Sequence, residues 1–141
     1  MITKSSKIVF ITGSSTGIGR ETALLFAHHG NKLIITHYND KIAGQNVKQE
    51  CLQAGALDVQ LIHLDLNNDD SIRRAVQKTI SQYHQIDILL NNAGILEHGA
   101  LINKSYEEID RQIHTNLTGL IKLTRECLPY VKESIVNIGS E

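Results

Sequence analysis

A glycine-rich turn near the N-terminus is the first feature of the sequence that could bind a ligand. Gly13, Gly17 and Gly19 are spaced as G-x-x-x-G-x-G between an apolar run and a segment of helical period. Gly13 permits a tight turn, Gly17 removes a side chain where a phosphate must approach the backbone, and Gly19 lets the helix pack closely. The helix N-terminus offers N–H groups and the positive end of its dipole. The turn predicts a phosphate site, with hydroxyl donors from Ser14 and Ser15.

Polar residues follow other apolar runs in the same manner. Asp65 comes shortly after the run at 58–63, Asn92 follows the run at 86–90, and Ser140 follows the run at 134–138. A doubly wound sheet binds its ligand at the carboxyl ends of its strands. Taken singly, these residues have plain structural explanations: Asp65 as a strand-end carboxylate and Asn92 as part of a capping turn.

The elements that must position these residues alternate along the chain. Short runs rich in β-branched residues predict strands, and they are continuous rather than alternating, as is typical of parallel strands covered on both faces. The predicted strands are residues 7–12, 32–37, 58–63, 86–90 and 134–138. Segments of helical period lie between them at 18–29, 41–54, 70–83 and 105–128. The order βαβαβαβαβ predicts an α/β fold with a doubly wound, Rossmann-like parallel sheet of five strands.

Local end signals support the predicted helices. Gly30 and Gly55 follow the first two, and asparagines 67 and 68 supply cap chemistry before the third. Ser105 and Glu108 form a capping box at the start of the last helix. Asn116 lies inside that helix, where asparagine is a poor helix former, so it requires a specific reason.

The bulk composition excludes several classes of protein. Hydrophobic residues make up 41%, charged residues 21%, and the formal net charge is -1, as in an ordinary globular domain without a nucleic-acid-binding basic excess. The N-terminal apolar run is too short for a signal peptide or membrane span, so we expect a cytoplasmic protein with no membrane partner. Cys51 and Cys127 lie far apart in different predicted helices, which argues against a disulfide. The seven histidines show no metal-ligand spacing, so no metal site is expected.

Five motifs in order resemble the short-chain dehydrogenase/reductase family, and the resemblance covers essentially the whole chain. They are TGSSTGIG (12–19), LDL (64–66), NNAG (91–94), TNLTG (115–119) and IVNIGS (135–140). The resemblance implies that the chain binds a nicotinamide dinucleotide, NADP or NAD, and acts on a small carbonyl or alcohol substrate. It assigns a set of residues to the cofactor: Gly13, Ser14, Ser15, Gly17, Ile18, Gly19, His37, Asp65, Leu66, Asn92, Ala93 and Gly94.

The resemblance also implies catalytic roles for two residues. Ser140 would donate a hydrogen bond to the reacting oxygen. Asn116 would hold a relay water through a carbonyl freed by a local helix distortion. In relatives, a Tyr-x-x-x-Lys pair that follows the serine transfers the proton.

That tyrosine–lysine pair has no match among residues 1–141. Tyr38, Tyr83, Tyr106 and Tyr130 each lack a lysine four residues on. We therefore expect residues 1–141 to be a single dinucleotide-binding domain, truncated at its C-terminus, that lacks normal hydride transfer and the family's later strands and helices. The outer edge of the last predicted strand should be unpaired.

The residues at the end of the second predicted strand favour NADP over NAD. An NAD enzyme usually has Asp or Glu there to bind the ribose 2′-OH, and His37 occupies this position. The arginine that NADP enzymes often carry here or in the glycine turn is also absent. His37 and Lys41 lie near enough in sequence to be considered in its place. NAD therefore remains the alternative.

Other functions fit parts of the pattern. A dinucleotide-binding module without catalysis, or the product of a decayed gene, would explain the missing tyrosine. A methyltransferase fits less well, because it would leave NNAG unexplained. Relatives commonly form dimers or tetramers through the long helix at 105–128 and the helix after it, so we expect a homo-oligomer for the full-length form.

Overall fold

The computed structural model describes residues 5–140 and contains the five predicted strands. They are β1 (Ile8–Ile11), β2 (Lys32–His37), β3 (Asp58–His63), β4 (Ile86–Asn91) and β5 (Val131–Asn137). The α-helices are α1 (Gly17–His28), α2 (Lys41–Ala54), α3 (Asp69–Tyr83), α4 (Tyr106–Ile113) and α5 (Gly119–Cys127). Three shorter turns of helix are η1 (Leu101–Asn103), η2 (His114–Thr118) and η3 (Leu128–Tyr130).

All strand pairs of the sheet are parallel, in the order β3-β2-β1-β4-β5. The chain moves outward from β1 to β3, then returns to place β4 on the other side of β1. The prediction of a doubly wound sheet is thus confirmed, and its switch point lies between β1 and β4.

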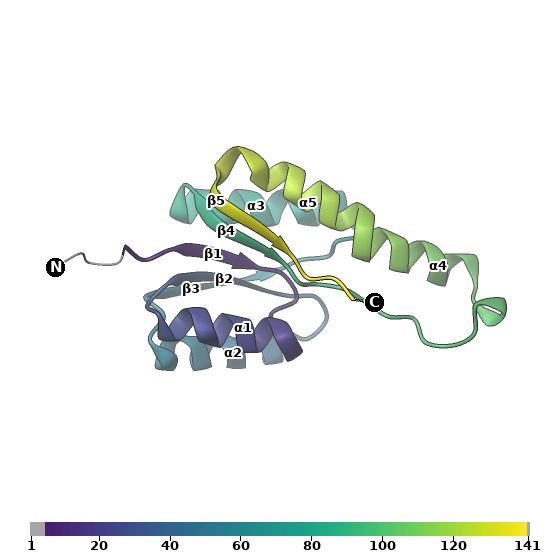
Figure 1. Ribbon diagram of the computed structural model, residues 1–141, viewed down its shortest axis with the longest axis horizontal. Coiled ribbons are helices and arrows are strands. Elements are labelled where there is room, and N and C mark those ends of the chain that lie inside the picture. The colour runs from purple at the N-terminus through teal and green to yellow at the C-terminus, as the bar shows by residue number, and fades with distance from the viewer. Residues whose placement is uncertain (1–4, 141) are drawn as a thin grey trace.

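Two helical layers cover the sheet, and each encloses its own core. Helices α1 and α2 lie on one face, and α3 and α5 on the other (Figure 1). In β1, Val9 and Ile11 belong to the core beneath α1 and α2, whereas Ile8 and Phe10 belong to the opposite core. This burial on both sides explains the continuous apolar run, because successive side chains of a strand point to opposite faces.

Strand β5 differs from its predicted bounds of 134–138, because pairing with β4 begins at Val131. A register shift between Ile86 and Ile88 accommodates the polar residues Lys132 and Glu133. Both are exposed at the sheet edge, so their polarity carries no burial penalty there. A strand can therefore include residues that the apolar pattern left out.

The predicted helix at 105–128 is interrupted in its middle. Residues His114–Thr118 form a π-helical turn in which the N–H of Gly119 bonds to the carbonyl of His114. Gly119 packs against the end of β3, where an added Cβ would lie 2.3 Å from the carbonyl oxygen of Leu66. The expected distortion at Asn116 is therefore present. No helix within residues 5–140 is both long and apolar enough to cross a membrane.

Candidate functional site

The glycine turn after β1 adopts a backbone conformation and a close packing that residues with a Cβ would disfavour. Gly13 has φ +59° and Gly17 has φ +56°, both in the left-handed region. A Cβ on Gly13 would lie 2.7 Å from the Cα of Ala93, whereas a Cβ on Gly17 would meet nothing within 4 Å. A Cβ on Gly19 would lie 2.3 Å from the carbonyl oxygen of Gly13. Gly13 and Gly19 thus permit close packing, and Gly17 leaves open space above the backbone.

The N-terminus of α1 lacks the side-chain cap that α2, α3 and α4 have. Asp40 caps α2, Asn68 caps α3, and Ser105 caps α4 as part of a capping box. Thr16, at the equivalent position of α1, makes no side-chain cap hydrogen bond, and the first turn contains no acidic residue. The first N–H groups of α1 and its positive dipole end are therefore available to an anion.

Thr12 joins the glycine turn to the segment after β4. Its Oγ1 accepts hydrogen bonds from the N–H groups of Asn92 (3.0 Å) and Ala93 (2.9 Å). In return, the side-chain amide of Asn92 donates to the carbonyls of Thr12 (3.1 Å) and Gly13 (3.0 Å). Sequence reasoning did not identify Thr12. Because the side-chain amide of Asn92 already donates to these two carbonyls, Asn92 would bind a ligand through its backbone.

Ser14 does not direct its hydroxyl toward a phosphate. It is fully buried, donates to the carbonyl of Ile11 at 2.8 Å and accepts from the N–H of Thr36 at 2.8 Å. These bonds fix the turn to β1 and β2, so the expected phosphate donor is a structural residue. Ser15 and Ile18 line the cleft described below.

His37 is also turned away from the site. It follows Leu33 and Ile35 on the face of β2 that packs beneath α2, because strand side chains repeat every second residue. The ring is buried, its Nδ1 has no hydrogen-bond partner, and its centroid lies 5.4 Å from that of His63. Burial, together with the charges of His63 and Lys41, lowers the pKa of His37 below its usual value.

The residues after β3 form a wall of the site. Asp65 accepts the N–H of Asn67 at 2.8 Å through Oδ1, and its own N–H donates to the hydroxyl of Ser71 at 2.9 Å. The side chain of Asn67 donates to Thr115 Oγ1 at 2.7 Å, which ties this turn to the π-helical segment. Leu66 is buried beside it.

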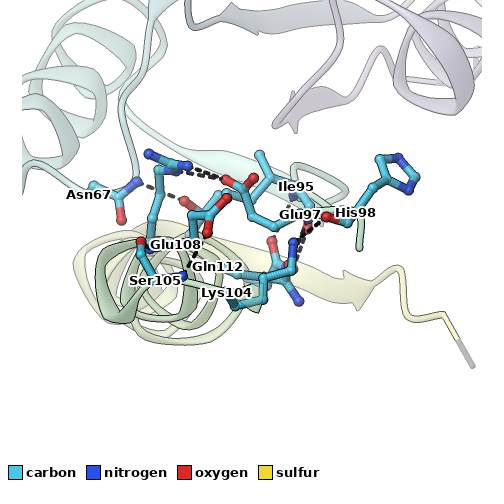
Figure 2. Close-up of polar contacts among 11 residues, drawn as sticks. Asn67, Ile95, Glu97, His98, Lys104, Ser105, Glu108 and Gln112 are labelled. Atoms are coloured by element: carbon cyan, nitrogen blue, oxygen red, sulfur yellow. Dashed lines mark hydrogen bonds and ion pairs between the residues drawn. The ribbon is translucent and has the colours of Figure 1, made fainter. Parts of the chain in front are cut away.

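Three side chains of α4 and η2 hold the segment that follows NNAG (Figure 2). The side chain of Asn116 accepts the N–H of Ile95 and donates to its carbonyl, both at 2.8 Å. Gln112, one helical turn earlier, accepts the N–H of Glu97 at 2.7 Å. The guanidinium of Arg111 contacts Oε1 of Glu97 at 2.5 Å and 2.8 Å through Nη2 and Nε. Sequence reasoning identified Asn116 but not Gln112 or Arg111.

These segments enclose one cleft of about 680 Å³ at the carboxyl end of the sheet, a volume typical of small-molecule sites. It lies where β1 and β4 meet. Its lining residues are Gly13, Ser15, Thr16, Gly17, Ile18, Tyr38, Asn39, Leu64, Asp65, Leu66, Asn67, Asn92, Ala93, Gly94, Ile95, Glu97, Arg111 and Thr115. Nine of the predicted cofactor residues are in this set; Ser14, Gly19 and His37 are not. At the end of β2, the cleft is lined by Tyr38 and Asn39 and not by His37.

The two predicted catalytic residues lie at the same edge of the sheet. Asn116 lies next to Gly94, which lines the cleft. A Cβ added to Gly94 would lie 3.3 Å from the side-chain oxygen of Asn116. Ser140 comes three residues after the end of β5, where the N–H of Ile138 bonds to the carbonyl of Asn91 at 3.0 Å. Within residues 5–140, no group of three or more histidine, cysteine or acidic side chains is arranged to hold a metal.

Comparison with known proteins gives a consistent result. The family model described as short chain dehydrogenase matches residues 7–141. A 3-oxoacyl-[acyl-carrier-protein] reductase of Thermotoga maritima is 35% identical over 138 residues, which cover 95% of this chain and 55% of that protein.

Solved structures agree with this fold. A dehydrogenase/reductase from Sinorhizobium meliloti superposes with a TM-score of 0.91 at 28% identity, over 99% of this chain and 56% of that one. An NADH-dependent reductase complexed with NAD has a TM-score of 0.87 at 25% identity, over 96% of this chain and 60% of that one. The chain spans about half the length of the curated relatives it matches.

Proposed function

Because the chain belongs to the short-chain dehydrogenase family, we propose that it provides the nucleotide-binding part of an oxidoreductase. The reaction would transfer a hydride between a nicotinamide dinucleotide and a carbonyl or alcohol substrate. The observation that carries the proposal is the uncapped N-terminus of α1, which opens beside Gly17 onto the cleft at the sheet's switch point.

The cleft residues divide into parts that suit a dinucleotide. Gly17 and the first turn of α1 would bind the pyrophosphate through backbone N–H groups. Asp65 and Leu66 would border the adenine. Ala93 and Gly94 would lie along the nicotinamide half, because they follow β4 on the other side of the switch point.

The chemistry at the substrate would depend on Asn116 and Ser140. A bound nicotinamide supplies or accepts the hydride, and the protein must stabilise the oxygen of the substrate and move a proton. Ser140 would donate a hydrogen bond to that oxygen. Asn116 holds Ile95 in place, and its π-helical turn would present a backbone carbonyl to a relay water.

Proton transfer has no evident tyrosine among residues 5–140. Tyr38 lines the cleft but has Ile42 four residues later, and the hydroxyl of Tyr83 bonds to Asp58 at 2.8 Å. This observation favours a second candidate function, binding of the dinucleotide without turnover. We propose that residues 1–141 alone bind the nucleotide and do not oxidise or reduce a substrate.

The nucleotide we favour is NADP. No carboxylate occupies the position at the end of β2 that would bind a ribose 2′-OH, because His37 stands there and Tyr38 and Asn39 line the cleft. A carboxylate there would also repel a 2′-phosphate, so its absence permits NADP.

Titration calorimetry of the purified chain with NADPH and NADH tests the proposal. We expect saturable binding of both, tighter for NADPH, with no change in NADPH absorbance at 340 nm over hours with simple ketones and aldehydes. A chain that is folded by circular dichroism and binds neither nucleotide at millimolar concentration would refute the dinucleotide function. Steady NADPH oxidation would refute only the proposal of binding without turnover.

A further inference from the structure

Arg111 is the single positively charged side chain among the described residues that line the cleft. Two carboxylates, Asp65 and Glu97, share the same lining. In the proposed function, the pyrophosphate of the dinucleotide would have the glycine turn and the N-terminus of α1 as its partners. A third phosphate, on the adenosine ribose, would need a separate cation.

The position of Arg111 is at the adenosine end of the cleft. It lies four residues before Thr115, so the two share one side of the helical segment. Thr115 bonds to Asn67 at 2.7 Å, directly after the Asp65–Leu66 wall. Tyr38, at the end of β2, lines the same cleft; the pKa of Arg111 is raised mainly by Glu97, and Tyr38 adds a small electrostatic contribution. Arg111 thus lies on the side of the cleft that faces the end of β2.

Arg111 is held in place yet remains accessible. Nε and Nη2 both contact Glu97, and the N–H of Glu97 is fixed by Gln112 at 2.7 Å. The Arg111 side chain is 52% exposed, and a guanidinium has five N–H donors. Donors therefore remain for an additional acceptor, and an anion would share Arg111 with Glu97 or displace it.

The other cations near the end of β2 are less suitable. His37 is buried, and its lowered pKa keeps the ring uncharged at neutral pH. Lys41 is exposed at the start of α2 and does not line the cleft. Arg20 is engaged by Glu21 and Glu50.

We propose that Arg111 is the residue with which this chain recognises a phosphate group on the adenosine ribose, and that Glu97 positions its guanidinium and competes with that phosphate. The inference rests on the proposed binding of a nicotinamide dinucleotide and makes Arg111 the determinant of preference for NADP. It also explains how a chain without arginine in the glycine turn or directly after β2 could bind this nucleotide.

The test compares ligands that differ only in the 2′-phosphate. NADPH, NADH, adenosine 2′,5′-bisphosphate and 5′-AMP are titrated calorimetrically into the unaltered chain and into Arg111→Gln, Glu97→Gln and Arg125→Gln. Arg125 is exposed on α5 and absent from the cleft lining, so its substitution is the matched control for loss of one positive charge. Circular dichroism and thermal unfolding establish that each variant is folded.

We expect Arg111→Gln to weaken binding of NADPH and the bisphosphate by about tenfold or more and to change NADH and 5′-AMP less than about twofold. Glu97→Gln should strengthen NADPH binding selectively, and the control should match the unaltered chain. Equal losses for NADPH and NADH in Arg111→Gln would overturn the inference, since Arg111 would then contact the adenine or shape the cleft. Unchanged NADPH binding would also overturn it. An unaltered chain that binds NADH normally but not NADPH would refute the inference alone, whereas binding of neither would refute the proposed function as well.

Discussion

Gly17 and Gly19 are two residues apart in the same turn but are required for different physical reasons. Gly17 is exposed, has a positive φ, and would leave a Cβ in open space. Gly19 is buried, and a Cβ would lie 2.3 Å from the Gly13 carbonyl oxygen and 2.5 Å from the Asn92 side-chain nitrogen. The first glycine serves backbone conformation and ligand approach, and the second serves packing.

Alanine at each position should separate these two roles. Gly17→Ala should lower the free energy of unfolding by roughly 1 kcal/mol, the cost of a left-handed conformation, and should sharply weaken nucleotide binding. Gly19→Ala should lower it by about 3 kcal/mol, because a backbone carbonyl cannot move aside as a flexible side chain can. Urea denaturation measures both. Equal destabilisation by the two substitutions would contradict the assignment.

The sequence predicted the residues of this turn better than it predicted the directions of their side chains. The glycines were recognisable because their spacing reflects a backbone requirement. Ser14 faces inward because β1 and β2 both offer it backbone partners, the Ile11 carbonyl and the Thr36 N–H, a relation that no local pattern contains. For His37, strand geometry places the ring on the same face as Leu33 and Ile35, but β2 is buried on both faces, so its continuous apolar run did not show which way the ring points.

At the scale of elements, the segment after NNAG is held by side chains rather than by a strand partner. Asn116 and Gln112 lie one helical turn apart and bind the backbones of Ile95 and Glu97, which are two residues apart in a segment without regular secondary structure. A helical turn rises about 5.4 Å and two residues of chain span at most about 6.6 Å, so the two spacings are compatible. Asn116 could be suspected from sequence, because asparagine is unfavourable inside a helix. Gln112 could not, because its role depends on the distance between two elements.

Hydrogen exchange can test whether these two contacts act separately. Asn116→Ala should speed exchange of the Ile95 amide by about tenfold or more, with a smaller effect at Glu97, because the Ile95 N–H loses its acceptor. Gln112→Ala should have the reverse pattern. Asn116→Ala should also lower the free energy of unfolding by about 1–2 kcal/mol. If either substitution releases both amides equally, the segment opens as one unit and the two contacts are not independent.

At the scale of the whole molecule, the layered fold was predictable because five buried strands left continuous apolar runs between helical segments. The bounds of β5 were less predictable, since Lys132 and Glu133 belong to an exposed edge. The same edge position leaves β5 paired only with β4 within the described residues. Two of the exposed surfaces of residues 5–140 are candidates for self-association: the edge of β5, and the outer side of α4 and α5.

The outer side of α4 and α5 is the more exposed of these two apolar surfaces. Ile113, Leu117 and Ile121 recur every four residues along α4, η2 and α5, and each is more than half exposed, from 51% to 55%. On β5, Val136 is 39% exposed. Burial of apolar area is the main favourable term in association, so we expect the helical surface to dominate a dimer.

Single lysine substitutions distinguish the two surfaces. Ile121→Lys should convert the associated chain to monomer in sedimentation velocity across a range of concentrations, because it places a charge at the centre of the apolar row. Val136→Lys should leave the association unchanged, since its side chain stands on β5 rather than on the helical surface. Both positions are already exposed, so thermal unfolding should change little in either variant. If only Val136→Lys yields monomer, association proceeds by strand pairing at β5, and a charge near this edge then suppresses it in the way charged residues protect sheet edges generally.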